Sequence, residues 1–392
     1  MIADTFPPLR TSGAVQMRDL ALAFVRDGHS VTVILPIENT KQSWLVENNE
    51  DVRILRLCVP KTKGVGYIRR ALGELLMPFY MRRNFTKSPL AAERWESVIW
   101  YAPSIFHGPF VNFLKKASGC KSYLIIRDIF PEWAVDIGLM RRNLPYYFFR
   151  AVARYQYSVA DVIGVQSQGN LQYFADWKRK PGRTLEVLQN WLGRPDSRPC
   201  SIQINETILA ERKIFVYAGN MGVAQSLDRL LELAQTMLSN TQVGFLFVGR
   251  GSEFLRLECD AQDLGLVNTL FFDEIHPDEI PTLYSQCDVG IVSLDARHKS
   301  HNIPGKFLTY MQAGLPVLAN VNPGNDLASI VRHENVGRVC ESNEIEELSI
   351  LCLDLLMEVD ADAFLAERCV NLFIREYAVK DKVKQISQSL QF

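Results

Sequence analysis

The chain has 392 residues, of which 47% are hydrophobic and 22% charged, and its net charge is −1. This length exceeds one ordinary core and suits two domains of somewhat under about 200 residues each, and the composition excludes a disordered or collagen-like chain. The small net charge hides an asymmetry, because residues 1–190 carry 26 Lys and Arg against 16 Asp and Glu, and the remainder carries 17 against 28. We therefore expect a basic domain followed by an acidic one.

The basic half is compatible with two kinds of partner, nucleic acid or an anionic membrane. No zinc knuckle, helix-turn-helix pattern or RNA-binding aromatic signature accompanies the charge, which disfavours nucleic acid. The eight cysteines are scattered without a C-x-x-C pair, which indicates buried thiols in a reducing compartment and no metal site. No run approaches the roughly 20 apolar residues of a membrane span, and no signal peptide is recognisable. We expect a cytoplasmic protein without metal or cofactor that meets a membrane only peripherally.

Apolar runs alternate with helical patterns almost from end to end, which is typical of parallel sheets wrapped by crossover helices. Strands are predicted at 30–35, 52–58, 97–101, 122–127, 162–166 and 185–188, and a helix at 15–26. Residues 1–4 make an unusually short first strand, which a start upstream of Met1 or a trimmed end would explain. After a linker predicted at 191–212, strands follow at 214–218, 243–248, 270–272, 289–293 and 317–319.

This pattern predicts an α/β protein with two Rossmann-like domains, 1–190 and 213–376, facing each other across a cleft. Ligands of such sheets bind at the carboxyl ends of the strands. A C-terminal helix at about 377–392 is expected to pack back on the first domain.

Two loops of the first half follow strand ends. Gly13 lies just before the first helix, where backbone N–H groups could meet a phosphate or a sugar, although such a turn is more often only a turn. The segment RDIFPEW, 127–133, places Asp128 and Glu132 after a strand, where carboxylates could bind sugar hydroxyls or take a proton. The alternative for this pair is a capped helix start with Pro131 in its first turn.

Two loops of the second half point to a phosphate. AGNMGVAQS, 218–226, is a Gly-rich turn whose N–H groups could bind a diphosphate, and it is neither a Walker motif nor G-x-G-x-x-G. In HNIPGKFLTYMQAGLPVLAN, 301–320, a Pro-Gly turn opens a helix with Lys306 and Thr309 on one face. The alternative is a plain helix-to-strand connection. The donor residues predicted from these loops are Gly219, Asn220, Met221, Gln225, Asn302, Pro304, Gly305, Lys306 and Thr309.

The order and spacing of these motifs resemble glycosyltransferase family 4, which has the GT-B fold. The resemblance is carried by FPP…SG, GHSVTVI, YAGNMGVAQSLDRLLELA, FLFVGRGSE, PGKFLTYMQAGLPVLA and VGRVCE, and spans essentially the whole chain. RDIFPEWAVDIGLM with GNMGVAQ is similar to the branch that builds bacterial O-antigen and capsule units, including presumed N-acetyl-L-fucosamine transferases. The resemblance implies a UDP-linked 6-deoxy amino sugar as donor and a polyprenyl-diphosphate-linked glycan as acceptor, at the inner face of the plasma membrane.

Several family positions differ here. The two donor-site glutamates of many members correspond to His301 and Thr309, and the Arg and Lys of the Gly-rich turn correspond to Asn220 and Gln225. The diphosphate charge still needs a cation, so Lys306 and Arg250 become the candidates. The family's histidine for the sugar 6-hydroxyl has no clear match, which fits a 6-deoxy donor, and His107 reads as structural.

The resemblance implies a retaining, metal-independent transfer in which the departing β-phosphate takes the acceptor proton, with backbone N–H groups, Lys306 and Arg250 stabilising the diphosphate. The candidate catalytic residues are Lys306, Asp128 and Glu132. No D-x-D follows a strand, since the match at 360–362 falls in a predicted interhelical turn, and this disfavours a metal-dependent GT-A enzyme. Two alternatives stay open. One is a UDP-sugar 2-epimerase that uses Asp128 and Glu132, and the other is a non-catalytic membrane scaffold.

Residues 61–94 mix basic and apolar side chains in a way that favours docking in the headgroup plane of an anionic bilayer. Eight Lys and Arg stand there against two Glu, and the apolar residues between them include Ile68, Leu72, Leu76, Met77 and Met81. A helix packed on the sheet with a solvated basic face is the alternative. The residues predicted to dock are Arg69, Arg70, Arg82 and Arg83.

Overall fold

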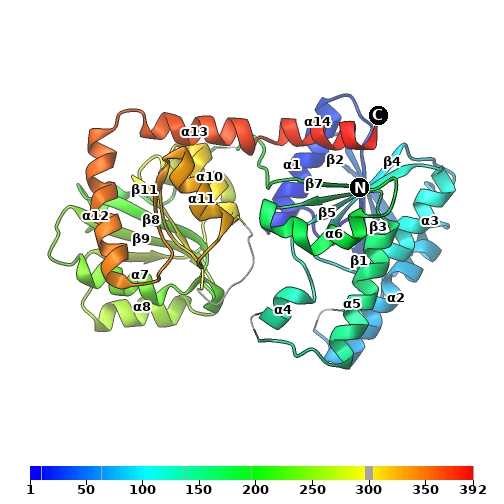
Figure 1. Ribbon diagram of the computed structural model, residues 1–392, viewed down its shortest axis with the longest axis horizontal. Coiled ribbons are helices and arrows are strands. Elements are labelled where there is room, and N and C mark those ends of the chain that lie inside the picture. The colour runs from blue at the N-terminus through cyan, green and yellow to red at the C-terminus, as the bar shows by residue number, and fades with distance from the viewer. Residues whose placement is uncertain (10, 63, 137, 196, 296–302, 392) are drawn as a thin grey trace. The chain divides into compact units, whose positions relative to one another are not determined.

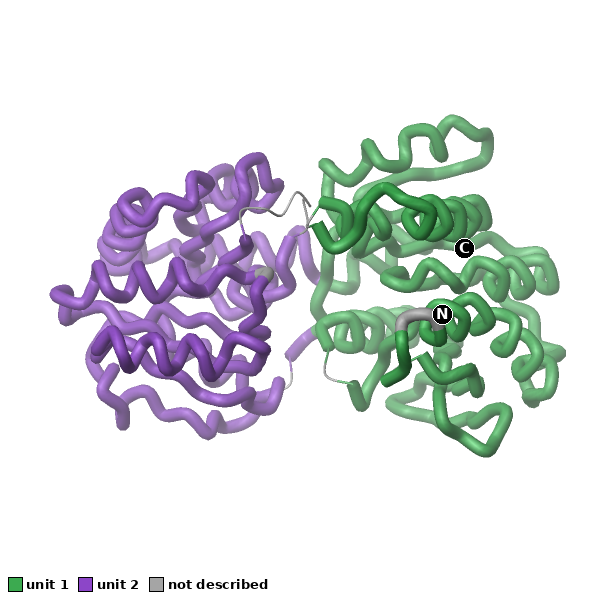
Figure 2. The backbone as a smooth tube through the Cα atoms, turned by 90° about the horizontal axis from the view of Figure 1, so that it is seen from below, with its two compact units in different colours: residues 1–193, 379–392 green, residues 194–378 purple. Residues whose placement is uncertain are grey.

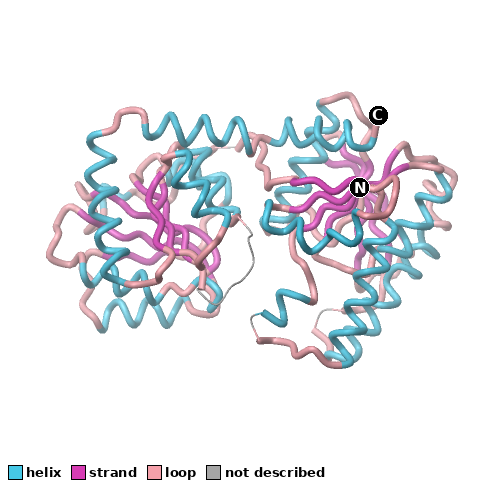
Figure 3. The backbone as a smooth tube through the Cα atoms, viewed as in Figure 1, coloured by secondary structure: helices cyan, strands magenta, loops and turns pink. Residues whose placement is uncertain are grey.

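The computed structural model describes residues 1–9, 11–62, 64–136, 138–195, 197–295 and 303–391 (Figure 1). The chain forms two compact units: unit 1 comprises Met1–Gly193 and Val379–Phe392, and unit 2 comprises Arg194–Ala378 (Figure 2). In each unit helices cover a largely parallel sheet (Figure 3). The predicted α/β class with two Rossmann-like units is confirmed.

The strands of unit 1 form groups with the orders β1-β3-β2 and β4-β5-β6-β7. Ile2 pairs in parallel with Ile34 and Trp100, so residues 1–3 fill the position between β1 and β4. β2 pairs antiparallel with β3 and is absent from the sequence prediction, because its half-exposed residues WLVENN lack a regular apolar alternation. The bounds are β1 Thr32–Ile37, β2 Trp44–Asn49, β3 Val52–Cys58, β4 Ser97–Ala102, β5 Lys121–Ile126, β6 Val162–Val165 and β7 Thr184–Val187.

Helices cover both faces of this sheet. On one face, α1 and α14 bury Leu20 and Val383 against the strands; on the other, α2, α3 and α5 bury Met81, Phe110 and Ala153 (Figure 1). The two faces have separate apolar cores, as expected for parallel strands buried on both sides. The bounds are α1 Ser12–Arg26, α2 Tyr67–Phe85, α3 Gly108–Ser118, α4 Glu132–Asp136, α5 Leu144–Val159, α6 Ala175–Lys178 and α14 Val379–Leu390.

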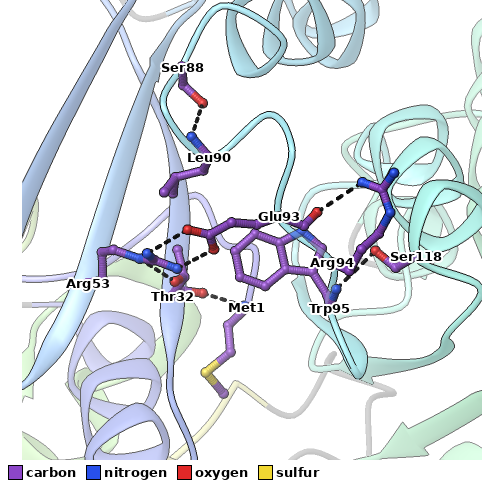
Figure 4. A network of polar contacts seen from close by, with 9 residues as sticks. All are labelled: Met1, Thr32, Arg53, Ser88, Leu90, Glu93, Arg94, Trp95 and Ser118. Carbon is purple, nitrogen blue, oxygen red and sulfur yellow. Dashed lines mark hydrogen bonds and ion pairs between the residues drawn. The ribbon is translucent and has the colours of Figure 1, made fainter.

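The amino ends of the unit 1 strands are tied together by polar contacts (Figure 4). The Met1 ammonium donates to Thr32 O at 2.6 Å, and burial lowers the pKa of that amino group to about 5. Arg53 donates from Nε to Thr32 Oγ1 at 2.8 Å, and its two terminal nitrogens bind the two carboxylate oxygens of Glu93 at 2.8 and 2.5 Å. Charged groups at this edge therefore have partners within the fold.

Unit 2 has one parallel sheet with the order β10-β9-β8-β11-β12-β13. One face shares an apolar core with α7, α8 and α12 that includes Val289 and Ile291 of β11. Gly290, between those two, points to the opposite face, since side chains alternate along a strand. There the ring of Tyr310 lies so close that a Cβ on Gly290 would be 2.3 Å from it, which places α10 on that face.

The strands of unit 2 are β8 Lys213–Asn220, β9 Val243–Arg250, β10 Thr269–Phe272, β11 Val289–Ser293, β12 Val317–Asn320 and β13 Gly337–Cys340. Its helices are α7 Asp228–Thr236, α8 Phe254–Asp263, α9 Ile280–Tyr284, α10 Gly305–Ala313, α11 Asp326–Glu334, α12 Ile345–Ala361 and α13 Leu365–Glu376.

The predicted linker at 191–212 is largely folded in the structure. Trp191 is fully buried in the core of unit 1 and donates its indole N–H to Gln16 O at 2.8 Å. Cys200, Ile202 and Leu209 are buried and belong to unit 2. These buried apolar residues, set among Pro and Arg, explain the difference, because they hold the segment against the two units. The chain passes from unit 1 to unit 2 at Gly193–Arg194 and returns at Val379, the first residue of α14.

Candidate functional site

In unit 2, β8 and β9 end in glycines whose backbones touch. Gly249 has φ +150°, and a Cβ there would lie 2.0 Å from Gly219 O. A Cβ on Gly251, at φ +157°, would lie 2.1 Å from Met221 O. Only glycine fits both positions, since an L side chain would meet backbone atoms and the left-handed conformation disfavours it. The carboxyl ends of the two strands therefore form one compact backbone surface.

The turn after β8 is held by its own amide side chains. Gln225 Oε1 accepts from Gly222 N at 3.0 Å and from Asn220 Nδ2 at 3.1 Å. Asn220 and Gln225, the positions at which the resemblance to family 4 would place a cation, thus fix the loop through uncharged amide groups. Met221 does not suit the donor-binding role predicted for it. Its side chain is fully buried in the core, and its N–H is bonded to Arg250 O at 2.8 Å.

Lys306 lies at the start of α10, which follows the N-cap residue Pro304 and begins at Gly305. Its Nζ is 3.4 Å from the ring centroid of Tyr217 and would lie 3.8 Å from a Cβ on Gly219. Tyr217 is fixed in turn, because its hydroxyl donates to Asn220 O at 2.6 Å. Within the described residues Lys306 forms no ion pair, and burial lowers the pKa of its ammonium to about 7. A cation is thus held over an aromatic face beside the Gly-rich turn.

The remaining donor residues of the sequence prediction differ in position. Thr309 is half-buried, and its hydroxyl donates to Lys306 O at 2.8 Å, so its role toward a ribose stays a prediction. Arg250 has 69% of its side chain exposed and pairs with Glu274 at 3.2 Å. Asn302 and His301 lie outside the described residues.

In unit 1, Asp128 follows β5 and keeps its side chain in contact with solvent. The dense surroundings nevertheless raise the pKa of its carboxyl by desolvation, and the neighbouring Arg127 opposes this rise. Arg127 is buried, with its guanidinium 4.4 Å from the Trp191 ring centroid and 6.0 Å from that of Tyr101. Gly13 lies beside the same tyrosine, because a Cβ there would be 3.1 Å from Tyr101 Oη. The structure thus gathers Gly13 and Arg127 around Tyr101.

Glu132 opens the short helix α4, as the capped-helix alternative expects. Its Oε1 lies 3.9 Å from Arg150 Nε of α5. Burial raises the pKa of the Glu132 carboxyl, and Arg150 acts in the opposite direction. The ion pair of Glu132 therefore runs to α5.

One polar pair was missed by the sequence reasoning. Asp4 directly follows the strand at 1–3, and its Oδ1 lies 2.8 Å from Nε2 of His107, which precedes α3. His107 is completely buried, in agreement with a structural role. The position of Asp4 after a strand is the signal that would have found it, since the same rule selected Asp128.

Helix α2 has an inner apolar face and an outer mixed face. Met77 and Met81 are buried in the core, so the prediction that they reach a membrane is wrong: they pack against the sheet. The outer face carries apolar side chains together with all four predicted docking arginines. These exposed residues are Leu72, Leu76, Phe79, Tyr80, Arg69, Arg70, Arg82 and Arg83.

None of the helices that the structure describes is both long and apolar enough to cross a membrane. In the same part of the chain, no group of three or more His, Cys, Asp or Glu is placed to hold a metal ion.

Most of unit 2 is similar to a known protein family. Residues 202–363 match the model of the family described as Glycosyl transferases group 1. This segment of unit 2 is similar to group 1 glycosyltransferases. Over 341 residues the chain is 24% identical to "Probable glycosyltransferase WbjE" of Pseudomonas aeruginosa, covering 86% of this chain and 83% of that protein. It is also 24% identical over 278 residues to WcaI of Escherichia coli (strain K12), named for colanic acid biosynthesis, covering 64% of this chain and 62% of that protein.

Solved structures agree on the GT-B fold. WaaG, a glycosyltransferase involved in lipopolysaccharide biosynthesis, aligns with TM-score 0.64 at 16% identity over 100% of this chain and 99% of its own. HepE of Anabaena, solved in complex with UDP, aligns with TM-score 0.66 at 14% identity over 100% and 99% of the two chains. Within the matched segment 202–363 of this chain, the Gly-rich turn and the start of α10 lie together through Gly219 and Lys306.

Proposed function

We propose that the chain is a retaining glycosyltransferase that uses a UDP-linked sugar, with a 6-deoxy amino sugar such as N-acetyl-L-fucosamine as the first candidate. The acceptor is a polyprenyl-diphosphate-linked glycan in the synthesis of O-antigen, capsule or exopolysaccharide. The observation that carries the proposal is the position of Lys306, an ammonium without an acidic partner among the described residues that lies on Tyr217 beside the Gly-rich turn.

The geometry of unit 2 suits a diphosphate for two reasons. The start of α10 offers backbone N–H groups and the positive end of a helix dipole, which favour anions. Lys306 adds a positive charge, and an arriving diphosphate would raise the pKa of this ammonium again, because a nearby anion stabilises the protonated form. UDP complexes of the structural neighbour HepE support a nucleotide at this kind of domain.

The reaction needs no carboxylate base. The bond between the sugar C1 and the diphosphate oxygen breaks, a bond from C1 to an acceptor hydroxyl oxygen forms on the same face, and the hydroxyl proton passes to the departing phosphate oxygen. Lys306 and the α10 N–H groups stabilise the charge that develops on the leaving diphosphate. Asp128 in unit 1 is exposed, and it is the carboxylate predicted to bind sugar hydroxyl groups.

The outer face of α2 supports docking at the inner surface of the plasma membrane. The exposed fractions of Leu72 and Phe79 are 53% and 56%, and their positions seven apart place them on one helix face. Arg69 and Arg83 lie near the two ends of this face and form no ion pair with described residues. Apolar side chains flanked by arginines suit the headgroup region of an anionic bilayer.

A panel of UDP- and GDP-sugars, incubated with membranes that contain polyprenyl-diphosphate-linked acceptors, tests the proposal. Transfer from a UDP-sugar only when acceptor is present is the expected result. Turnover of a UDP-sugar without acceptor to its 2-epimer would instead identify an epimerase. Absence of UDP binding in calorimetry would support a non-catalytic scaffold.

A further inference from the structure

The pair formed by Asp4 and His107 lies at the carboxyl end of the central strand of unit 1. Residues 1–3 lie between β1 and β4 through the bridges of Ile2, so Asp4 emerges at the middle of the sheet. His107 comes from the loop between β4 and α3. The hydrogen bond of 2.8 Å joins residues 103 positions apart in the chain.

The polar contacts of His107 distinguish it from a residue that only packs in the core. Its ring is completely buried, and an ionised carboxylate has only acceptors, so Nε2 donates to Asp4. Nδ1 is also buried, and within the described residues it has no hydrogen-bond partner. Leaving a buried nitrogen unpaired costs free energy, and exceptions of this kind call for an explanation beyond packing. Among the described residues, the hydrogen bond to Asp4 is therefore the polar contact that this imidazole makes.

Asp4 itself is open to solvent. Its side chain is 30% exposed, and Oδ2 has no hydrogen-bond partner among the residues that the structure describes. In that same part of the chain no Lys or Arg pairs with this carboxylate, so His107 orients its charge without a cation neutralising it. Arg53 and Glu93 at the amino end of the sheet differ in this respect, because they bind each other through two hydrogen bonds.

The surroundings of Asp4 are suited to a polyhydroxylated ligand. The neighbouring Thr5 and the ring of Tyr101 come so close to Gly13 that a Cβ there would lie 3.2 and 3.1 Å from them. Thr5 Oγ1 and Thr11 Oγ1 share a hydrogen bond of 2.8 Å. Hydroxyl groups and an oriented carboxylate at one strand end are the groups that bind sugar hydroxyls.

We propose that Asp4 binds the acceptor sugar: its Oδ2 accepts a hydrogen bond from an acceptor hydroxyl, and His107 is the positioning residue that fixes the carboxylate. This inference rests on the proposed function. Asp4 takes no proton in this step, because the proton of the attacking hydroxyl leaves with the departing phosphate. Asp4 thus fixes the acceptor, while unit 2 binds the donor.

The test compares Asp4→Asn and Asp4→Ala with the wild-type chain. Asp4→Asn keeps an oxygen that can accept from His107 but removes the charge. In both variants we expect the KM for acceptor to rise about tenfold or more, as for a lost hydrogen bond to a charged group. The Kd for UDP and the slow hydrolysis of UDP-sugar by water should stay within about twofold, since neither involves the acceptor.

His107→Gln and His107→Phe supply the second arm. Glutamine can donate to Asp4 and should restore a lower acceptor KM than phenylalanine, with the UDP Kd unchanged in both. Unchanged acceptor kinetics in Asp4→Ala would overturn the proposal. So would a parallel fall of transfer, hydrolysis and Tm in both Asp4 variants, which indicates a purely structural pair. Failure of the wild-type chain to bind UDP would overturn the proposed function and this inference together, a result distinct from any change limited to the variants.

Discussion

The carboxyl edges of the two sheets differ in whether backbone groups or side chains form them. In unit 2 the edge is mostly backbone, with Gly249 packed on Gly219 and Gly251 on the backbone of Met221, and with Lys306 as the cation above Tyr217. In unit 1 the edge consists of side chains, among them the buried Arg127 and the pair of Asp4 and His107. Backbone N–H groups suit a phosphate, which is the same in every nucleotide sugar, whereas oriented side chains suit the varied hydroxyl pattern of an acceptor.

The largest expected effect comes from removing the cation of the backbone-built edge. Lys306→Ala should lower kcat/KM about 10²- to 10³-fold, because one preorganised charge on a leaving diphosphate is worth about 2.7–4 kcal/mol. Steady-state kinetics with the UDP-sugar identified by the panel measures this. Lys380→Ala, which alters an exposed lysine of α14, is the matched control and should leave kcat/KM unchanged. Equal losses in the two variants would count against a specific role of Lys306.

The pH dependence of UDP binding should follow the same lysine. The pKa of Lys306 is about 7 in the free chain, and a bound diphosphate raises it. Affinity that depends on the ammonium is therefore greatest below pH 7 and is lost as pH rises through the pKa of the complex. Between pH 7 and 9 the Kd should rise by up to about 50-fold. Lys306→Arg should flatten this profile, because arginine stays charged, and calorimetry across the pH range checks it.

The backbone-built edge of unit 2 could be predicted from the sequence more fully than the edge of unit 1, which side chains form. The Gly-rich turn and the Pro-Gly helix start are local patterns, so the position of Lys306 at a helix start could be predicted from a short segment. The strand β11 could also be predicted from its own short apolar run. Asp4 and His107 are 103 residues apart, and no local pattern joins them. Met221 lies inside the Gly-rich motif, yet its side chain completes the apolar core. Trp191 lies among linker-like residues but is buried in unit 1.

A third test concerns the outer face of α2. Arg69→Ser combined with Arg83→Ser should weaken binding to vesicles rich in anionic lipid about 30-fold, because each arginine near the surface contributes about 1 kcal/mol. Wild-type binding should also fall with salt. Replacing Arg179 and Arg183, which lie outside α2, is the control. Equal co-sedimentation of all three proteins would refute docking through α2.

The smallest effect is expected at the amino edge of unit 1, where charges already have partners. Glu93→Gln removes the charge that binds Arg53 through two hydrogen bonds. Because both side chains are about one-third exposed, the free energy of unfolding should fall by only about 1 kcal/mol or less. Urea unfolding measures this loss, and kcat/KM should stay unchanged. A large loss of activity in a stable Glu93→Gln variant would show that the amino edge takes part in function.

The most direct measurement of the central claim is an experimental structure of the chain with UDP bound. The account predicts that Lys306 Nζ lies within about 3 Å of an oxygen of the diphosphate, which is hydrogen-bonding distance, and that the N–H groups at the start of α10 face the same anion. A UDP molecule whose diphosphate lies away from α10, with Lys306 still resting on the ring of Tyr217, would contradict it.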